Sequence, residues 1–484
     1  MSSIIRSSPR ISPRQIYDSA VELCLRRGYI YIGSEIYGGL SSQYDYGPIG
    51  TMLKNNIRSQ WWNSFIARRD CVPIESSIIM NRKVWEVAGH VDNFTDPFTE
   101  CRQCQTRYRV DHLLESLGWN LPSNAQSSDH LQLYSQALSE LHPNCKDKLC
   151  SGTLTVPKYF NMLFETSSSC SQDQKVYLRP ETAQGAYINF HNVLRSTRRS
   201  VPFGIGQIGK SFRNEISPGQ FIFRTKEFEQ AELQWFCKPD TADHWHSYWI
   251  DYSMNWLIDH GLNPQLLRQH RHQQLAHYSK ATTDIEFRFG FSDNDDGGWG
   301  EIWGISNRGD YDLTVHSSAS GRSMACSTTG QDQDKFLPYI IEPALGIDRL
   351  FLAVIVNGFS EEIVHGRRRV FLRLDPRLSP YEIAVFPVVG KSTDLVRKAE
   401  ELFDVLAREN RRVDFDDKGS IGRRYRRHDE IGTPLCATID SQTLVDNTVA
   451  LRCRDTMQQR RVSIEGLAHR STCNGILDYN EIDN

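Results

Sequence analysis

The 484-residue sequence lacks any long apolar run. Its longest uninterrupted stretches are short, such as Leu350 to Val356, whereas a membrane-spanning helix needs about 18 apolar residues. It also lacks internal repeats and low-complexity tracts. The net charge of −3 provides no global positive field, so any polyanion must be met by a local basic patch. We therefore expect a soluble globular protein with no membrane segment.

The cysteines lack the dense spacing of a disulfide framework. Twelve are scattered along the chain, and no hydrophobic signal segment precedes them. This pattern favours a reducing compartment, and we expect the cytoplasm. The start of the chain, MSSIIRSSPRISPRQIY, is rich in Ser and Arg and has no acid before Asp18. Two interpretations of it stay open: an organelle transit peptide, or a short disordered tail.

The composition changes near RLDPRLSPYE (373–382), a proline-containing stretch typical of a linker. Beyond it the strand-like IAVFPVV precedes a helical pattern over 394–410, and a second strand-like run, RRVDFDD, follows. Within the helical pattern Leu395, Ala399, Leu402 and Leu406 recur at helical spacing. The C-terminal part is therefore predicted to be a small α/β domain with a mainly parallel or mixed sheet.

Before the linker, strand-like runs come in clusters, with helical segments such as 52–65 and 244–259 between them. This is the α+β pattern, in which helices surround an antiparallel sheet. Polar, Ser-rich and Cys-bearing sequence over 96–157 interrupts these elements and is expected to be an insertion.

The stretch SFRNEISPGQFIFRTKEFEQAELQWF (211–236) is predicted to be a hairpin joined by Ser217-Pro218-Gly219-Gln220. Because strand side chains alternate between faces, Arg213 and Glu215 would share one face of the first strand. Guanidinium groups can bind phosphate and an aromatic ring can stack on a base, so coinciding faces would form a nucleotide site. The alternative is an edge hairpin whose charges face water. On the second strand the residues expected to line up are Arg224, Phe228, Gln230 and Glu232.

Several long motifs resemble one enzyme family. GKSFRNEISPGQFIFRTKEFEQAE and EPALGIDRLFLAV are similar to the second and third signature motifs of class II aminoacyl-tRNA synthetases. More narrowly, the chain resembles the dimeric-type glycyl-tRNA synthetases, and the matching motifs cover nearly all of it in the family's order. They are GSEIYGGLSSQYDYGPIG, GHVDNFTDP, LRPETAQGAYINF, GWGEIWGISNRGDYDL and RRHDEIGTPL.

The resemblance implies an α+β fold: a class II catalytic domain (1–375), in which helices flank an antiparallel sheet of six or seven strands, and a C-terminal α/β anticodon-binding domain (376–484). The inserted lobe at about 96–157 would belong to the first domain. The resemblance also implies ATP and Mg²⁺, a glycyl-adenylate, and glycyl transfer to the 3′ end of tRNA(Gly) with release of AMP and pyrophosphate. Because the glycine carboxylate is itself the nucleophile, the enzyme has to position two anions and stabilise the charge that develops on phosphorus.

Carried over by motif, the expected catalytic residues are Arg213, Glu215 and Arg349. Arg213 would contact the α-phosphate and Glu215 the adenine amino group or its surroundings, while Arg349 would clamp the other adenine face or the γ-phosphate. Phe228 would stack on adenine, Arg224 would lie near the β- and γ-phosphates, and Glu301 would lie by ATP and its Mg²⁺. The complete expected ATP-binding set is Arg213, Asn214, Glu215, Phe223, Arg224, Thr225, Lys226, Glu227, Phe228, Glu301, Ile302, Gly346, Ile347, Asp348 and Arg349.

Glycine has no side chain, so its selection has to rely on filled space and on contacts to its ammonium group. The resemblance assigns the ammonium contacts to Glu181, Glu232 and Glu342. The chain departs from the family at Ala344, where a serine is usual, and we expect activity to survive the change. The complete expected glycine-binding set is Arg109, Glu181, Phe228, Glu229, Gln230, Ala231, Glu232, Glu342, Pro343, Ala344, Leu345 and Gly346.

The pairs in CRQC (101–104) and HPNCKDKLC (142–150) resemble a zinc ribbon, with Cys101, Cys104, Cys145 and Cys150 as Zn²⁺ ligands. The second pair is irregular, since four residues separate its cysteines and His142 could compete as the fourth ligand. The alternative is a set of metal-free thiols packed in a small lobe.

In IGRRYRRHDEIG (421–432) four arginines surround Tyr425, a pattern that suits RNA phosphates and an unpaired base but also an exposed helix face. The family is usually homodimeric through the first motif, here residues 47–80, where Trp61 and Trp62 would suit either the interface or the core. Two other functions stay open: a catalytically inactive nucleic-acid-binding relative, against which the retained motif arginines argue, and a class II synthetase for another amino acid.

Overall fold

The computed structural model describes residues 6–7, 11–122, 129–145, 150–167, 175–216, 219–273, 275–276, 278–292, 298–327 and 335–469. The expected turn at Ser217-Pro218, most of the first ten residues and the segment after residue 469 lie outside these ranges. Among the described residues, no helix is long and apolar enough to cross a membrane.

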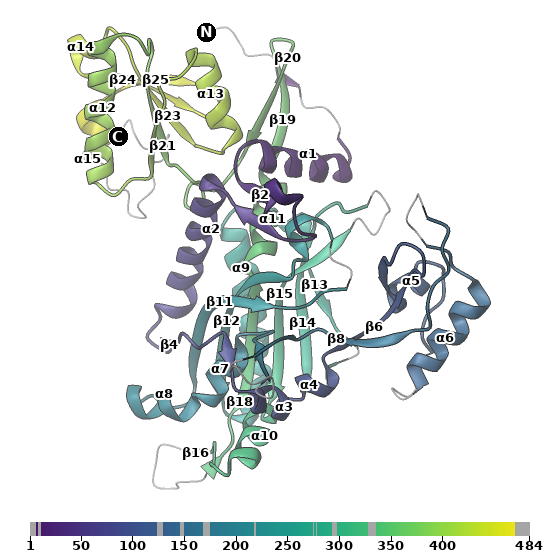
Figure 1. Cartoon of the computed structure of the whole chain (residues 1–484). Helices are drawn as coiled ribbons and strands as arrows, with labels where there is room; N and C mark the ends of the chain where they lie inside the picture. Colours follow the sequence, from purple (N-terminus) through teal and green to yellow (C-terminus); the bar gives the residue numbers. More distant parts are fainter. Residues whose placement is uncertain are drawn as a thin grey trace.

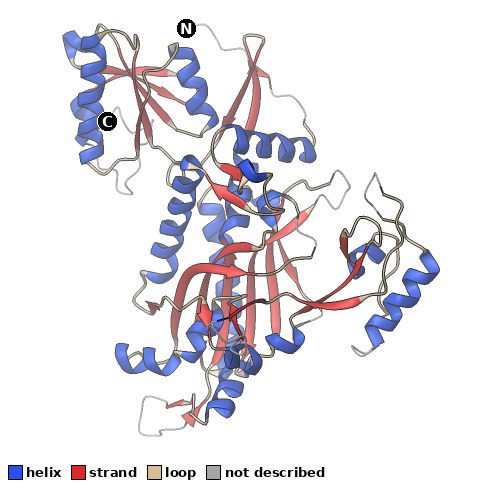
Figure 2. Ribbon diagram, viewed as in Figure 1, coloured by secondary structure: helices blue, strands red, loops and turns tan. Residues whose placement is uncertain are grey.

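A seven-stranded sheet forms the centre of the molecule (Figures 1 and 2). All its neighbouring strands are antiparallel except β4 and β11, which are parallel. This sheet confirms the expected antiparallel class II architecture. In spatial order its strands are β13 (Leu267–Arg271), β14 (Ala281–Arg288), β15 (Trp299–Gly309), β18 (Tyr339–Gly346), β12 (Glu227–Cys237), β11 (Phe203–Phe212) and β4 (Cys71–Pro73).

Each face of the sheet has its own layer of helices, and the alternation of strand side chains decides which residues meet which layer. On β12 the odd-numbered Ala231, Leu233 and Trp235 join the large core, whereas Phe236 joins a second core on the opposite face. The large core packs against α1 (Pro13–Arg26), α2 (Pro48–Trp61), α9 (Ala242–Asp259) and α11 (Ile347–Gly358). The second core packs against α7 (Ala183–Ile188), α8 (Phe190–Thr197) and α10 (Tyr311–Ser320).

The predicted charged hairpin differs from the observed one. β11 ends at Phe212, which pairs with Glu227 at the start of β12, so a long connection replaces a four-residue turn. Gln220 and Phe221 adopt left-handed conformations, with φ of 58° and 57°, and lead into a short 3₁₀ turn, Phe221–Phe223. The prediction that Arg213, Glu215 and Arg224 lie on strand faces is therefore wrong, because all three are in the connection.

The other predicted helices are present with shifted ends. The segment predicted over 52–65 is α2 followed by a π-helical turn, Trp62–Ile66, and the segment predicted over 244–259 is α9. Trp61 is fully buried in the large core, while Trp62 keeps 37% of its surface exposed.

The segment over 96–157 contributes to a lobe that projects from the main sheet (Figure 1, right). Its own small core consists of Val110, Leu114, Tyr134 and Ala137. The lobe is built from β6 (Thr95–Glu100), β7 (Arg107–Arg109), β8 (Lys158–Asn161), α5 (Val110–Glu115) and α6 (His130–Leu141).

Residues 383–469 form a five-stranded mixed sheet with a separate hydrophobic core. Strands β22 (Val413–Phe415), β21 (Ile383–Pro387) and β23 (Leu435–Ile439) are parallel, and β24 (Thr448–Cys453) and β25 (Gln459–Ser463) extend the sheet antiparallel. This confirms the predicted α/β pattern. The four residues predicted for the helical stripe are buried on α12. The helices are α12 (Thr393–Arg408), α13 (Ile421–Glu430), α14 (Thr443–Asp446) and α15 (Ile464–His469).

Smaller elements connect these parts. The three-stranded sheet β1 (Arg6–Ser7), β19 (Phe359–Val364) and β20 (Arg367–Leu372) lies beside α13 of the C-terminal part, at the top of the view (Figure 1). The remaining strands and helices are β2 (Ile30–Ile32), β3 (Tyr44–Tyr46), β5 (Ile79–Met80), β9 (Phe164–Ser167), β10 (Lys175–Leu178), β16 (Cys326–Ser327), β17 (Lys335–Phe336), α3 (Arg82–Val87) and α4 (His90–Asn93).

Candidate active site

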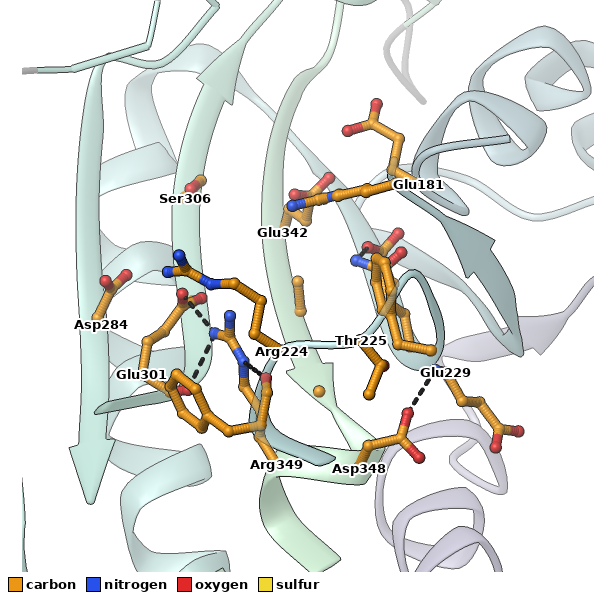
Figure 3. A pocket seen from close by; sticks show the side chains of 18 of the residues that line it. Glu181, Arg224, Thr225, Glu229, Asp284, Glu301, Ser306, Glu342, Asp348 and Arg349 are labelled. Atoms are coloured by element: carbon orange, nitrogen blue, oxygen red, sulfur yellow. Dashed lines mark hydrogen bonds and ion pairs between the residues drawn. The ribbon is translucent and has the colours of Figure 1, made fainter. Parts of the chain in front are cut away.

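A cavity of about 300 Å³ opens on the α7 side of the main sheet. It unites residues from β12, β15 and β18, the β11–β12 connection and the start of α11 (Figure 3). The predicted residues that line it are Glu181, Arg213, Glu215, Phe223, Arg224, Thr225, Phe228, Glu229, Gln230, Glu232, Glu301, Glu342, Ala344, Gly346, Asp348 and Arg349. The structure thus brings together side chains that are separated by up to 168 positions in the sequence.

Arg349 lies in the first turn of α11 and is held from two sides. Its Nη1 donates to the Glu301 carboxylate at 2.8 Å and to the Glu301 carbonyl oxygen at 3.0 Å. Its guanidinium carbon lies 4.5 Å from the centre of the Phe223 ring, in the geometry of a cation–π contact. These contacts fix the direction in which Arg349 points into the cavity.

Two further arginines reach the cavity from the β11–β12 connection. Arg213 Nε donates to the Pro180 carbonyl oxygen at 3.1 Å, and the guanidinium carbon lies 5.2 Å from the centre of the Phe228 ring. Within the described residues, no hydrogen bond or ion pair engages the Arg224 guanidinium. In Figure 3 Arg224 extends beside Glu301 and Arg349. This half of the cavity therefore offers positive charge for phosphate groups and an aromatic face for a base, the two features that bind a nucleoside triphosphate.

Carboxylates on β14 and β15 form the opposite wall of the same half. Asp284 accepts from His272 at 2.7 Å, and Glu301 lies near it. Burial and the Glu301 charge raise the pKa of Asp284 to about 6. Because carboxylate oxygens are the protein ligands that Mg²⁺ prefers, the position and half-exposed carboxylate of Glu301 fit a magnesium ion beside a bound triphosphate.

The other half of the cavity is acidic and buried. Glu181, Glu232 and Glu342 are each at least 92% buried, and the buried Arg308 lies 3.7 Å from Glu181 and 3.2 Å from Glu342. Arg308 makes a two-pronged ion pair with Asp312, at 2.8 and 3.1 Å, and donates to Glu342 at 3.2 Å.

Neighbouring polar groups fix the three carboxylates. Thr182 donates to Glu232 at 2.5 Å and Gln230 donates to its second oxygen at 2.7 Å. Tyr187 donates to Glu342 at 3.0 Å, and Gln184 to Glu181 at 3.0 Å. A buried polar network of this kind offsets the cost of removing its groups from water only when those groups are hydrogen-bonded.

The charges in this half do not balance. Burial raises the pKa of Glu232 to about 8, and the carboxylates of Glu342 and Glu181 add to the effect. Burial also raises the pKa of Glu342 despite Arg308. Burial opposes ionisation of Glu181 as well, but His90 and Arg308 outweigh it and lower that pKa. A small cation bound among the three carboxylates would therefore be favoured, since it would replace the proton that Glu232 otherwise holds.

Several predicted residues do not line the cavity. Ala231, Pro343 and Leu345 alternate with the cavity-facing residues and are buried, as are Ile302 and Ile347. Arg109 lies in the projecting lobe, in ion pairs with Asp96 at 3.0 Å and Asp111 at 2.5 Å. The others are Asn214, Lys226 and Glu227.

Two predicted residues at the cavity edge are already occupied by a buried network. Asp348 accepts from Lys54 of α2 at 2.5 Å and from the Glu229 backbone at 2.7 Å, and Glu229 also pairs with Lys54 at 3.1 Å. Burial opposes the ionised form of Asp348, but Lys54 outweighs it and lowers its pKa. In Figure 3 both side chains point away from the cavity centre. They tie α2 to the strand and the helix that carry the site.

Several neighbours of the predicted site residues were not predicted from the sequence. Arg308 and Asp312 lie inside a quoted motif, and their spacing of four on a strand-to-helix boundary was the available signal. Gly304 and Ser306 line the cavity and lie inside the same quoted motif. No local pattern marks the lining residues His272, Tyr278, Thr282 and Asp284, and Ile222 lies in the charged connection without having been predicted.

The four predicted zinc-ligand cysteines do converge. Their sulfur atoms all lie within 4.8 Å of one another, with Cys101 and Cys150 at 3.6 Å and Cys104 and Cys145 at 3.5 Å. The backbone N–H groups of Gln103 and Gly152 point at Cys101 and Cys150, each at 3.4 Å.

The basic helix α13 is less open than its sequence suggests. Arg424 is 1% exposed and donates to the carbonyl oxygens of Asp417 and Gly419, so it holds a loop. The Tyr425 hydroxyl is within 2.6 Å of Thr438 Oγ1. Arg427 pairs with Asp416 at 2.5 Å. Of the four arginines, Arg423 is the exposed one.

Comparison with known proteins gives two family matches and many close relatives. Residues 164–358 match the tRNA synthetase class II core domain (G, H, P, S and T), and residues 382–472 match the anticodon binding domain. A glycine--tRNA ligase of Thermobifida fusca is 47% identical over 93% of this chain and 96% of its own length. Glycine--tRNA ligases of Alkaliphilus oremlandii and Cutibacterium acnes are 45% and 47% identical, each over 93% of this chain and over 96% and 94% of their own lengths.

Proposed function

The chain belongs to the glycine--tRNA ligases, which are class II aminoacyl-tRNA synthetases, and we propose how its cavity performs their reaction. The enzyme activates glycine with ATP and transfers the glycyl group to the 3′ end of tRNA(Gly). The glycine carboxylate attacks the α-phosphorus and forms glycyl-adenylate, and the bond to pyrophosphate breaks. The terminal adenosine hydroxyl then attacks the glycyl carbonyl carbon, and AMP leaves.

In our proposal the basic half of the cavity binds ATP. Phe228 stacks on adenine and Glu215 accepts from its amino group, while Arg213 contacts the α-phosphate. Arg224 meets the β- and γ-phosphates, which agrees with its extended guanidinium, for which the described part of the chain supplies no ion pair. Arg349, held by Glu301 and Phe223, clamps the nucleotide from the other side.

Magnesium, when bound by Glu301 beside the triphosphate, would neutralise charge on the phosphates and favour departure of pyrophosphate. The chain itself supplies positioning and electrostatic stabilisation, and the proposal assigns no general base, because the attacking carboxylate is already ionised.

The acidic half is proposed to bind glycine. The ammonium group would lie among Glu181, Glu232 and Glu342, whose unbalanced charge supports this assignment most directly. The Arg308–Glu342 pair fills the adjoining space with two rigid, hydrogen-bonded side chains, so a larger amino acid would meet both. Ala344 lines the same cavity without adding a hydroxyl.

We further propose a structural Zn²⁺ on Cys101, Cys104, Cys145 and Cys150. Hydrogen bonding with Thr106 lowers the pKa of Cys104 to about 6. Although the Gly152 N–H favours its thiolate, burial and the neighbouring thiols raise the pKa of Cys150 to about 12. Four clustered thiols cannot all ionise unless a cation compensates them, and tetrahedral sulfur ligation is the preference of zinc.

The remaining assignments rest on the family. We propose a cytoplasmic homodimer, a catalytic domain over 1–375 and an anticodon-binding domain over 376–484 that contacts tRNA(Gly).

ATP–pyrophosphate exchange across a panel of amino acids tests the proposal. We expect exchange with glycine and little with alanine or serine. A preference for alanine would overturn the glycine assignment, and no exchange with any amino acid would favour a nucleic-acid-binding protein without catalysis.

A further inference from the structure

The motif GHVDNFTDP (89–97) lies where the chain passes from the elements around the main sheet to the projecting lobe, and it contains none of the predicted site residues. Gly89, with φ of 80°, begins the short helix α4, and Phe94 then leads into β6. Figure 1 shows α4 beside the main sheet, at the base of the lobe. Two side chains of this motif, His90 and Phe94, contact residues that line the catalytic cavity.

His90 is buried between aromatic rings and reaches a carboxylate with one nitrogen. The centre of its ring lies 5.3 Å from that of Trp85 and 5.7 Å from that of Phe94. Its Nε2 lies 3.4 Å from Oε1 of Glu181, whereas its Nδ1 is buried and no described residue offers it a hydrogen bond. A buried polar atom without a partner costs stability, so packing alone does not explain a histidine at this position.

Glu181 is held through one of its two oxygens. Gln184 donates to Oε1 at 3.0 Å, and His90 Nε2 and Arg308 Nη2 lie 3.4 and 3.7 Å from the same atom. No hydrogen bond from a described residue reaches Oε2. Burial opposes ionisation of Glu181, but the charges of His90 and Arg308 outweigh it and lower its pKa. Glu181 is therefore an ionised carboxylate with one fixed oxygen, and its other oxygen is left for the glycine ammonium group.

Phe94 makes the corresponding contact in the ATP half of the cavity. The guanidinium carbon of Arg213 lies 5.4 Å from the centre of the Phe94 ring and 5.2 Å from that of Phe228, both in the range of a cation–π contact. Backbone hydrogen bonds link the same parts of the chain. The Met162 N–H donates to the Phe94 carbonyl oxygen at 3.0 Å, and the Asn214 N–H donates to the Met162 carbonyl oxygen at 2.8 Å. The base of the lobe is thus joined to the connection that carries Arg213.

We propose that His90 and Phe94 are positioning residues, of which His90 orients Glu181 for the glycine ammonium group and Phe94 orients Arg213 for the α-phosphate. The inference rests on the proposed function, because it names the groups that hold two of the proposed substrate contacts. The glycine carboxylate has to meet the α-phosphorus in line, so a small displacement of either contact lowers the rate. One short segment at the base of the lobe therefore aligns both substrates.

The test is glycine-dependent ATP–pyrophosphate exchange by the full-length protein, with each substrate varied while the other is saturating. His90→Leu should raise the KM for glycine about 10- to 100-fold, the effect of losing one hydrogen bond to a charged group, and leave kcat/KM for ATP unchanged. Phe94→Leu should lower kcat/KM for ATP about two- to fivefold, the effect of one cation–π contact, and leave the KM for glycine unchanged. Damage to the packing of α4 would instead move both constants in both variants.

Further variants separate positioning from packing. His90→Gln places an amide nitrogen near the Nε2 position, so its KM for glycine should lie closer to the wild-type value than to that of His90→Leu. Val91→Ala is the matched control, since Val91 lies on α4 and packs in the same hydrophobic cluster as Phe94 but takes part in neither contact. It should alter neither constant. If His90→Leu folds poorly, His90→Asn replaces it, because its shorter amide stops short of Glu181 and should also raise the KM for glycine.

Three results would overturn the inference while the unmodified enzyme shows normal exchange with glycine. The first is an unchanged KM for glycine in His90→Leu or His90→Asn. The second is an unchanged kcat/KM for ATP in Phe94→Leu. The third is a loss of both constants in all variants, Val91→Ala included, which would assign the segment a role in packing alone. Absence of exchange in the unmodified enzyme would instead refute the proposed function.

Discussion

Glu232 offers the sharpest test of the glycine pocket, because its pKa of about 8 lies in an accessible range. If the glycine ammonium and a proton compete for this carboxylate, the KM for glycine should rise as pH falls. With one competing proton, KM scales as 1 + 10^(8 − pH), so it should be about eightfold higher at pH 7 than at pH 8.5. Glu232→Gln should remove this dependence and weaken glycine binding by roughly 1.5–3 kcal/mol, the value of a hydrogen bond to a charged group.

The assay is glycine-dependent ATP–pyrophosphate exchange at saturating ATP, with KM for ATP followed as the internal control. Glu227→Gln is a matched variant, since Glu227 begins the same strand but is exposed and pairs with Lys210 at 2.7 Å. It should keep the wild-type pH profile. A glycine KM that is flat from pH 6.5 to 8.5, or a Glu232→Gln enzyme that retains the slope, would refute the competition argument.

Four further outcomes follow from the same contacts. The pKa of Glu232 is higher in the folded state than in the unfolded state, so the stability that its protonated form contributes is complete below the unfolded-state pKa and is lost as pH rises through about 8. At pH 9 without ligands, thermal unfolding should therefore show the Glu232→Gln variant more stable than the wild type. Lys54→Met leaves Asp348 buried without its cation, while Glu229 keeps its ion pair with Arg58, and should cost about 3–5 kcal/mol in urea unfolding. Loss of the half-buried Lys398, which pairs with the exposed Glu401, should cost under about 1 kcal/mol. Arg349→Gln should lower the exchange rate by about 10²–10³, and an equal rate would remove it from the ATP site. Elemental analysis should find one zinc per chain and none in Cys101→Ser combined with Cys104→Ser; zinc retained by that variant would contradict the ligand set.

The sequence predicted most of the fold because its signals are local or cover long motifs. The helical stripe on α12 and the continuous apolar run of β21 each follow from periodicity within one segment. The charged connection after β11 did not follow, since two left-handed residues, Gln220 and Phe221, decide its path. The alternation of strand side chains predicted which residues share a face only where the strand pairing continues, as for Phe228, Gln230 and Glu232 on β12.

Site residues were predicted where they lie inside a recognisable motif. They were missed where only the pairing with another segment brings them into the cavity. Arg349 and Glu301 are each recognisable alone, but Asp284 enters the cavity only through the pairing of β14 with β15. Glu229 and Asp348 show the opposite failure. They belong to the motifs, yet both carboxylates form ion pairs with Lys54 of α2, because helix packing brings this buried cation next to them.

The same unbalanced charge explains both the binding and the selectivity of the acidic half. Three carboxylates and Asp312 face the Arg308 guanidinium and, at Glu181, the His90 ring at 3.4 Å, so negative groups still outnumber positive ones and the empty pocket favours a proton or a cation. The ammonium group of glycine supplies that positive charge, and glycine brings no side chain into the pocket. Any larger amino acid also has to displace Arg308 or Glu342. Moving either breaks hydrogen bonds inside a buried network and exposes an uncompensated charge to a low-dielectric interior. Alanine at position 344 does not change this selectivity, because larger amino acids are excluded by the Arg308–Glu342 pair and not by a hydroxyl group. Ala344→Ser should therefore change the glycine KM by less than about tenfold, the effect expected of one neutral hydrogen bond, and leave the exclusion of alanine as it is.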